Sequence, residues 1–154
     1  MKTRHLILGL LFLGQSSCTY HDISLISYAD DPSITSLNGT WKVVSFENYT
    51  NNSVEYKNQT NSWGYDIVIT FDDSKTPKQF SGKNTTNDIF GGFEYVTQRQ
   101  FLLLQFGTTE VGQPTWAYNF SHAMLNKGNR FIINWTKLRI FFDNDSKSVS
   151  LERQ

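Results

Sequence analysis

The chain is poor in the residues that define several protein classes. Its 154 residues include one cysteine and three histidines, and 14 basic side chains balance 14 acidic ones. One cysteine cannot form an intramolecular disulfide, which excludes a disulfide-stapled miniprotein and a cysteine-rich zinc site. A formal net charge of zero gives no electrostatic basis for nucleic-acid binding, so we expect no nucleic-acid partner.

The motifs of common catalytic sites are also missing. The sequence contains no G-x-S-x-G nucleophile elbow and no glycine-rich phosphate-binding loop. His122 is the only histidine after residue 36, which excludes a histidine-rich metal site there. We therefore predict no catalytic residue, no metal and no cofactor, and hence no enzyme. A hydrolase using Asp88, Glu94 or His122 would require these groups to converge in one cleft.

The first 17 residues have the features of a secretory signal. Lys2 and Arg4 precede an uncharged apolar run from Leu6 to Leu13, and small polar residues follow. This run is far shorter than the roughly 20 residues that a membrane-spanning helix needs. We predict that residues 1–17 form a signal peptide.

The position of the only cysteine refines this prediction. Cys18 follows the small residues Ser16 and Ser17, and this arrangement resembles the lipobox of bacterial lipoproteins, although Gln15 stands where leucine is usual. The resemblance implies cleavage before Cys18 and attachment of lipid to it, with palmitate among the acyl chains. Such a chain would be anchored to a bacterial membrane, the outer membrane being the expected one. The alternative is ordinary secretion without acylation.

Polar residues dominate the stretch 18–36, which we interpret as the lipidated N-terminus and a tether. The following residues, 37–154, have the size of one domain, and alternating apolar and polar residues predict antiparallel strands there. Strands are expected over 39–47, 65–71, 79–82, 89–96, 101–106, 131–135, 138–142 and 149–151, and a long loop over 48–64.

One helix is expected between the fifth and sixth of these strands. It starts at Pro114, presents Trp116 and Phe120 at helical spacing, and stops at Gly128. The predicted fold is mainly β with one helix, formally α+β. It is a small, highly curved antiparallel sheet or partly closed barrel with the helix packed on it.

Four segments, in their order along the chain, resemble the META-domain family, the HslJ-like heat-shock and envelope lipoproteins. They are the opening 37–43, the Asn…Gly-x-Tyr-like stretch 87–95, the Thr-Thr segment 106–110 and the terminal strands 129–152. The candidate binding or motif positions in these segments are Trp41, Asn87, Gly91, Thr108 and Thr109. The resemblance implies a META-like β domain over 37–154 and a stress-related envelope role, and it supplies no catalytic residues.

Two functions from different classes follow. The first is a non-enzymatic envelope lipoprotein with a structural or protein-interaction role, whose partners are the membrane and another envelope protein. The alternative is a calycin-like or lipocalin-like module that binds a small hydrophobic ligand, suggested by the Gly39-Thr40-Trp41 opening and an aromatic content of 15%. Packing of the aromatic residues into a core is the competing explanation for that content.

Overall fold

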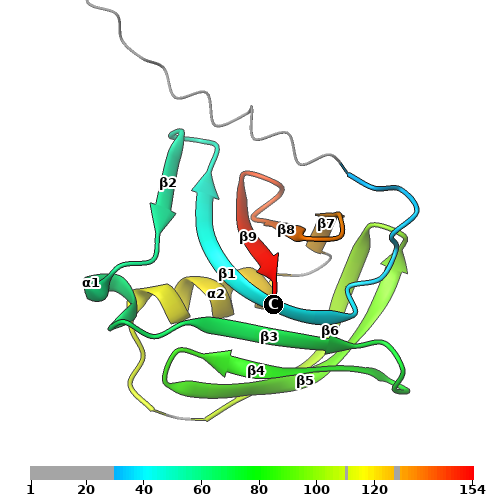
Figure 1. The fold of residues 1–154 in the computed structure, drawn as a ribbon, viewed down its shortest axis with the longest axis horizontal. Helices are drawn as coiled ribbons and strands as arrows, with labels where there is room; N and C mark the ends of the chain where they lie inside the picture. Colours follow the sequence, from blue (N-terminus) through cyan, green and yellow to red (C-terminus); the bar gives the residue numbers. More distant parts are fainter. Residues whose placement is uncertain (1–29, 110, 127–128) are drawn as a thin grey trace, which may run out of the picture.

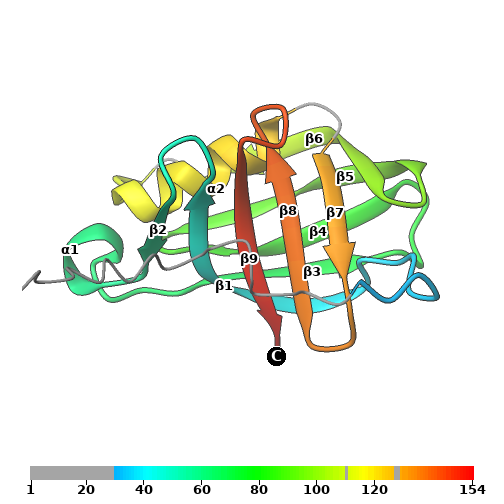
Figure 2. The ribbon, with the colours of Figure 1, turned by 90° about the horizontal axis from the view of Figure 1, so that it is seen from above.

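The computed structural model describes residues 30–109, 111–126 and 129–154. Eight antiparallel strands form a closed barrel in which each strand pairs with the next and the last returns to the first (Figures 1 and 2). They are β1 (Gly39–Asn48), β3 (Ile67–Asp72), β4 (Lys78–Asn84), β5 (Asn87–Thr97), β6 (Gln100–Thr108), β7 (Asn129–Ile133), β8 (Lys137–Phe142) and β9 (Lys147–Arg153). The predicted barrel is confirmed, and it is closed where we expected partial closure.

Strand β1 closes the barrel because it has neighbours along both edges. One edge pairs with β9 from Trp41–Arg153 to Asn48–Lys147. The other edge pairs first with β3 and then with the ninth strand, β2 (Ser53–Tyr56), which lies outside the barrel circuit. A β-bulge between Val43 and Ser45 shifts the register, so that Val43 and Phe46 both belong to the core.

The described residues contain two helices, where the sequence predicted one. The predicted loop 48–64 contains β2 and a short helix, α1 (Gln59–Ser62). Asn58 caps α1, since its side-chain oxygen accepts hydrogen bonds from the backbone N–H groups of Thr60 and Asn61, each at 2.9 Å. The loop prediction was therefore wrong in part, because the short capped turn has no apolar periodicity to reveal it.

The second helix, α2 (Thr115–Leu125), is the one that the sequence predicted. It lies across one end of the barrel and contacts β4, β6, β8 and β9 (Figures 1 and 2). We call this the helix end; it also carries β2 and the β8–β9 turn. The predicted stop at Gly128 lies outside the described residues. Within the described ranges, neither helix is long and apolar enough to cross a membrane.

Aromatic side chains meet inside the barrel. The Phe71 and Phe93 rings pack edge to face with centroids 5.3 Å apart, and Phe101 packs against both. At the helix end, Trp116 from α2 packs against Phe46 at 4.7 Å. These five side chains are buried, which explains the high aromatic content as core packing.

At the opposite end of the barrel, residues 30–37 bind to the strands before β1 begins. The Asp31 N–H donates to the Ile133 carbonyl at 3.0 Å, while the Arg99 guanidinium donates to the carbonyls of Asp31 and Ile34. The Leu37 N–H donates to the Tyr95 hydroxyl at 2.7 Å. We call this the tether end, because the chain enters the barrel here.

One predicted detail needs correction at the tether end. The strand expected over 131–135 ends at Ile133, and Trp135 lies in the following turn with 70% of its surface exposed. The junction of β6 and β7 has the fewest paired residues in the barrel wall, Gln100–Arg130 and Phe101–Asn129.

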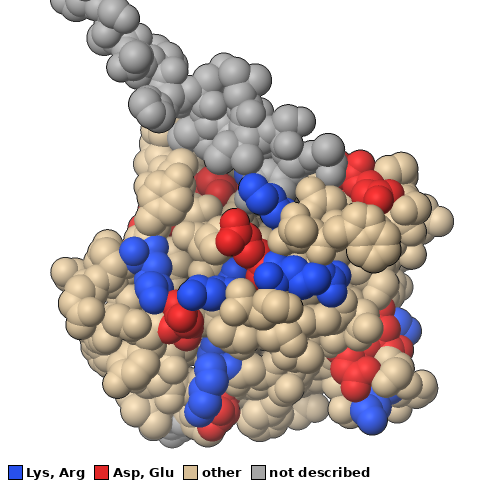
Figure 3. Space-filling view, in the orientation of Figure 1, with Lys and Arg blue, Asp and Glu red and all other residues tan. Residues whose placement is uncertain are grey.

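Opposite charges are interspersed on the face shown in Figure 3, where basic and acidic side chains lie side by side. Opposite charges also pair directly: Asp66 lies 3.0 Å from Lys42 Nζ and 2.5 Å from Lys57 Nζ. These hydrogen bonds, that from Lys57 first, hold the pKa of Asp66 below its usual value. Such pairing leaves no extended field of one sign on this face.

Gly91 provides the first test of the fold. A Cβ at Gly91 would overlap the Gln105 carbonyl oxygen and lie 2.8 Å from the Phe80 ring. We expect Gly91→Ala to lower the free energy of unfolding by about 3 kcal/mol, measured by urea denaturation. Gly112→Ala is the control, because a Cβ there meets nothing within 4 Å. Equal effects of the two substitutions would contradict the packing described here.

Candidate functional site

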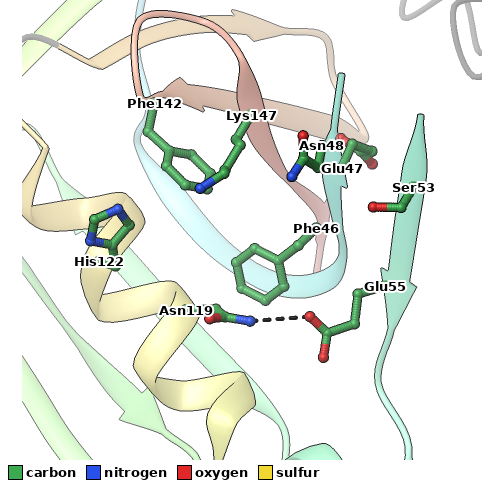
Figure 4. Close-up of a pocket in the computed structure, with 9 residues that line it drawn as sticks. All are labelled: Phe46, Glu47, Asn48, Ser53, Glu55, Asn119, His122, Phe142 and Lys147. Atoms are coloured by element: carbon green, nitrogen blue, oxygen red, sulfur yellow. Dashed lines mark hydrogen bonds between the residues drawn. The ribbon is translucent and has the colours of Figure 1, made fainter. Parts of the chain in front are cut away.

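A surface pocket of about 190 Å³ lies at the helix end. Five elements or their ends form it: the end of β1, β2, α2, the end of β8 and the start of β9 (Figure 4). Its walls combine two phenylalanine rings, Phe46 and Phe142, with amide, hydroxyl and charged side chains. Ligand pockets of drug-sized molecules occupy about 300–1,000 Å³, so this pocket suits a single side chain or a smaller group.

Asp143 contacts the two basic residues that line the pocket, His122 and Lys147, which form its positive side. Its carboxylate accepts hydrogen bonds from Lys147 Nζ at 2.8 Å and Asn126 Nδ2 at 3.0 Å, and it lies 3.2 Å from His122 Nε2. The hydrogen bond from Lys147 lowers the pKa of Asp143; burial opposes this shift, and the charges of Lys147 and His122 add to it. The charge of Lys147 is thus balanced by a neighbouring carboxylate.

Asp143 reaches this position because the β8–β9 turn takes an unusual conformation. Asp143, Asn144 and Asp145 have φ values of 51°, 56° and 62°. Asp and Asn tolerate this left-handed region better than other residues with a side chain. The strands predicted over 138–142 and 149–151 are confirmed, and this turn joins them as the antiparallel pair β8–β9.

Glu55 forms the negative side of the pocket. It lies on β2, and its carboxylate accepts hydrogen bonds from Asn61 Nδ2 at 2.8 Å and from Asn119 Nδ2 at 3.1 Å. Figure 4 shows the second bond, which joins β2 to α2 beside the Phe46 ring. Both donors are neutral amides, so they orient the carboxylate without neutralising its charge.

Glu47 lines this pocket and is also part of the barrel wall. Only 4% of its surface is exposed. Its carboxylate accepts hydrogen bonds from the hydroxyls of Ser45 at 2.6 Å, Ser150 at 2.8 Å and Ser148, and it lies 3.6 Å from Arg139 Nε. A buried carboxylate with these partners links β1 to β9 and β8, which is a structural role.

Three of the predicted motif positions lie together in a second place, at the base of α2. Asn87 is buried, and its side chain donates to the Val111 carbonyl at 3.0 Å and accepts from the Val111 N–H at 2.9 Å. The Thr109 hydroxyl donates to Asn87 Oδ1 at 3.1 Å and accepts from the Asp88 N–H at 3.0 Å. The neighbouring Thr108 hydroxyl donates to the Thr109 carbonyl at 3.2 Å. This cluster holds the chain between β6 and α2.

The other predicted positions lie apart from that cluster. Trp41 is buried in the core, where its Nε1 donates to the Leu37 carbonyl at 2.8 Å. Gly91 lies on β5 against Phe80. Cys18, the predicted lipid attachment residue, lies outside the described residues.

The three groups of the hydrolase hypothesis have separate surroundings. Asp88 pairs with Lys83 at 2.6 Å, whereas His122 faces Asp143. Glu94 is exposed on β5, six residues beyond Asp88, a separation of roughly 20 Å along a strand. The pocket residues Glu55, Asn119 and Lys147 were missed by sequence reasoning, because they come from three elements far apart in the chain.

Two solved structures share this fold. A protein from Burkholderia xenovorans, determined by NMR, aligns with a TM-score of 0.63 and 13% identity, over 81% of this chain and 89% of that one. A DUF4847 family protein from Bacteroides vulgatus aligns with a TM-score of 0.55 and 18% identity, over 76% of this chain and 93% of that one. At these identities the likeness concerns the fold alone. No protein-family model and no curated protein matches the sequence.

The Asn87 cluster can be tested by removing its central amide. We expect Asn87→Ala to lower the free energy of unfolding by about 3 kcal/mol, because it removes the hydrogen bonds that the buried Asn87 side chain forms with Val111 and Thr109. Urea denaturation followed by circular dichroism measures the change. The control is Thr108→Ala, whose exposed hydroxyl bond should contribute less than about 0.5 kcal/mol. A mild effect of Asn87→Ala, similar to that of the control, would argue against the anchoring role.

Asp143 should make the free energy of unfolding depend on pH. Its folded-state pKa lies below the ordinary value of 3.8, so its ionised form stabilises the native state above that pH. This contribution is lost as the pH falls through the lower, folded-state pKa. We expect the difference in unfolding free energy between the wild type and Asp143→Asn to be largest near pH 7 and to shrink below about pH 4. Chemical denaturation across this range measures it, and a difference independent of pH would contradict the assignment.

Proposed function

We propose that this protein is a non-enzymatic bacterial envelope lipoprotein, anchored to the membrane by lipid on Cys18. Its barrel acts as a rigid module for contacts with another envelope protein. The stress-related role implied by the META-like segments belongs to the same proposal, as does the outer membrane as its destination. Secretion in soluble form is the outcome if Cys18 is not acylated.

The aromatic filling of the barrel is the observation that carries the interaction role. The Phe71, Phe93 and Phe101 rings contact one another across the interior, and Trp116 packs at the helix end. Side chains packed in this way stabilise a fixed shape and occupy the space that a carried ligand would need. The separate surroundings of Asp88, Glu94 and His122 support the non-enzymatic part of the proposal.

The calycin-like alternative is favoured by one observation, the closed eight-stranded antiparallel barrel itself. A small hydrophobic ligand would enter such a barrel from an open end. Here Trp116 and Phe120 of α2 are buried at one end. We therefore rank this alternative second.

The tether end supports the anchoring geometry. Asp30 and Asp31 are held there by Arg99 and Ile133, and Asp30 follows Cys18 by 12 residues. Twelve residues span at most about 40 Å when fully extended. A lipid on Cys18 would therefore keep the barrel close to the membrane, with the chain entering at the tether end and the pocket at the opposite end.

Replacing Cys18 tests the anchor directly. We expect the wild type to incorporate radiolabelled palmitate and to sediment with membranes, and Cys18→Ser to lose both properties, because serine cannot form the thioether that initiates lipoprotein acylation. Ser16→Ala, which keeps a small residue before the cysteine, is the control and should be labelled like the wild type. Full membrane retention of Cys18→Ser would refute the lipid anchor.

A further inference from the structure

From the pocket at the helix end, we infer a binding site for a basic side chain of a partner protein, a lysine ammonium or an arginine guanidinium. The inference deepens the proposed interaction role and rests on it.

The charge balance leaves one carboxylate uncompensated. Lys147 is paired with Asp143, and Glu47 with Arg139. Glu55 has no Lys, Arg or His partner within ion-pair distance among the residues that the structure describes, and only the amides of Asn61 and Asn119 bind it. These two donors fix the carboxylate at the pocket wall and leave its remaining lone pairs for another donor. A charged donor completes such a site better than a neutral one, since charge-assisted hydrogen bonds are about twice as strong.

The shape of the pocket selects the same ligand class. Its volume of about 190 Å³ admits one side chain, and the rings of Phe46 and Phe142 line it. The methylene stem of a lysine or arginine packs well against such rings while its charged group reaches a carboxylate. The Phe142 ring already accommodates an ammonium group of the protein itself, because Lys147 Nζ lies 6.0 Å from its centroid.

The place of the pocket favours a protein over a lipid as the source of the basic group. The tether enters the barrel at one end, and the pocket lies at the other, between β2 and α2 (Figures 1 and 4). Ammonium headgroups of the anchoring bilayer would thus approach the wrong end. Tyr56 on β2 and Tyr118 on α2 are next to Glu55 and Asn119 in the chain, are 62% and 63% exposed, and belong to the residue type enriched at protein interfaces.

The experiment uses the full chain with Cys18→Ser, purified in detergent, so that its result does not depend on acylation. N-acetyl-lysine methylamide is titrated as the probe, and backbone amide NMR shifts report binding. We expect saturable shifts at Glu55 and Asn119, and at least tenfold weaker binding to a chain that also carries Glu55→Gln. Glu94→Gln, the same change at an exposed position on β5, should bind the probe like its parent.

A second probe, titrated with the unaltered pocket, gives a result that does not depend on whether the Glu55 variant folds. The Nε-acetylated form of the same lysine derivative keeps its stem but lacks the charge, and we expect it to bind the unaltered pocket at least tenfold more weakly. The inference is overturned if the charged probe gives no saturable shifts, or if either loss is smaller than tenfold. A wild type that takes up no palmitate, while the charged probe still binds as expected, would refute the anchor alone, so the two failures are distinguishable.

Discussion

The pairing of β1 with β9 is the constraint on which the barrel depends. These strands are the first and the last of the domain in the sequence, and their pairing converts a long curved sheet into a closed barrel. The bulge between Val43 and Ser45 adjusts this union, because it places Val43 and Phe46 in the core while Ser45 and Glu47 meet the serines of β9. The buried Glu47 carboxylate then binds hydroxyls from both strands, so closure is secured by backbone pairing and by side chains.

The strand pattern could be predicted from the sequence because burial alternates along most strands. The run 67–72 alternates between buried and partly buried residues and needs no information from elsewhere in the chain. Closure could not be predicted, since periodicity reveals which face of a strand is buried but not which distant strand lies beside it. The bulge in β1 hid the inward position of Phe46 for the same reason. The resemblance to a family singled out Asn87 and Thr109 as candidate binding or motif positions. Their hydrogen bonds instead hold the chain that leads into α2.

The pocket escaped prediction because each of its polar groups has an ordinary sequence context. Glu55 lies in a stretch rich in Asn, Ser and Thr, which is typical of a loop, and β2 is only four residues long. The cap Asn58-x-x-Asn61 was the one local signal for α1. His122 lies on α2, but its partner Asp143 comes from a turn whose left-handed backbone no periodicity indicates. Long-range pairing therefore defines the site, as it defines the fold.

The contacts of residues 30–37 with the barrel at the tether end, which we call the clasp, have a mechanical consequence. A force pulling on the chain before Asp30 is first resisted by the bonds of the Asp30 carboxylate to Arg99 and to the Ile133 N–H. The Asp31–Ile133 hydrogen bond and the bonds of Arg99 to the Asp31 and Ile34 carbonyls follow. The Leu37–Tyr95 bond comes next, and only then does the load reach β1. These short-range bonds can break and reform one at a time, whereas shearing β1 from β9 would open the wall of the barrel. These contacts of residues 30–37 would thus carry a pulling force on the preceding chain before the barrel strands separate.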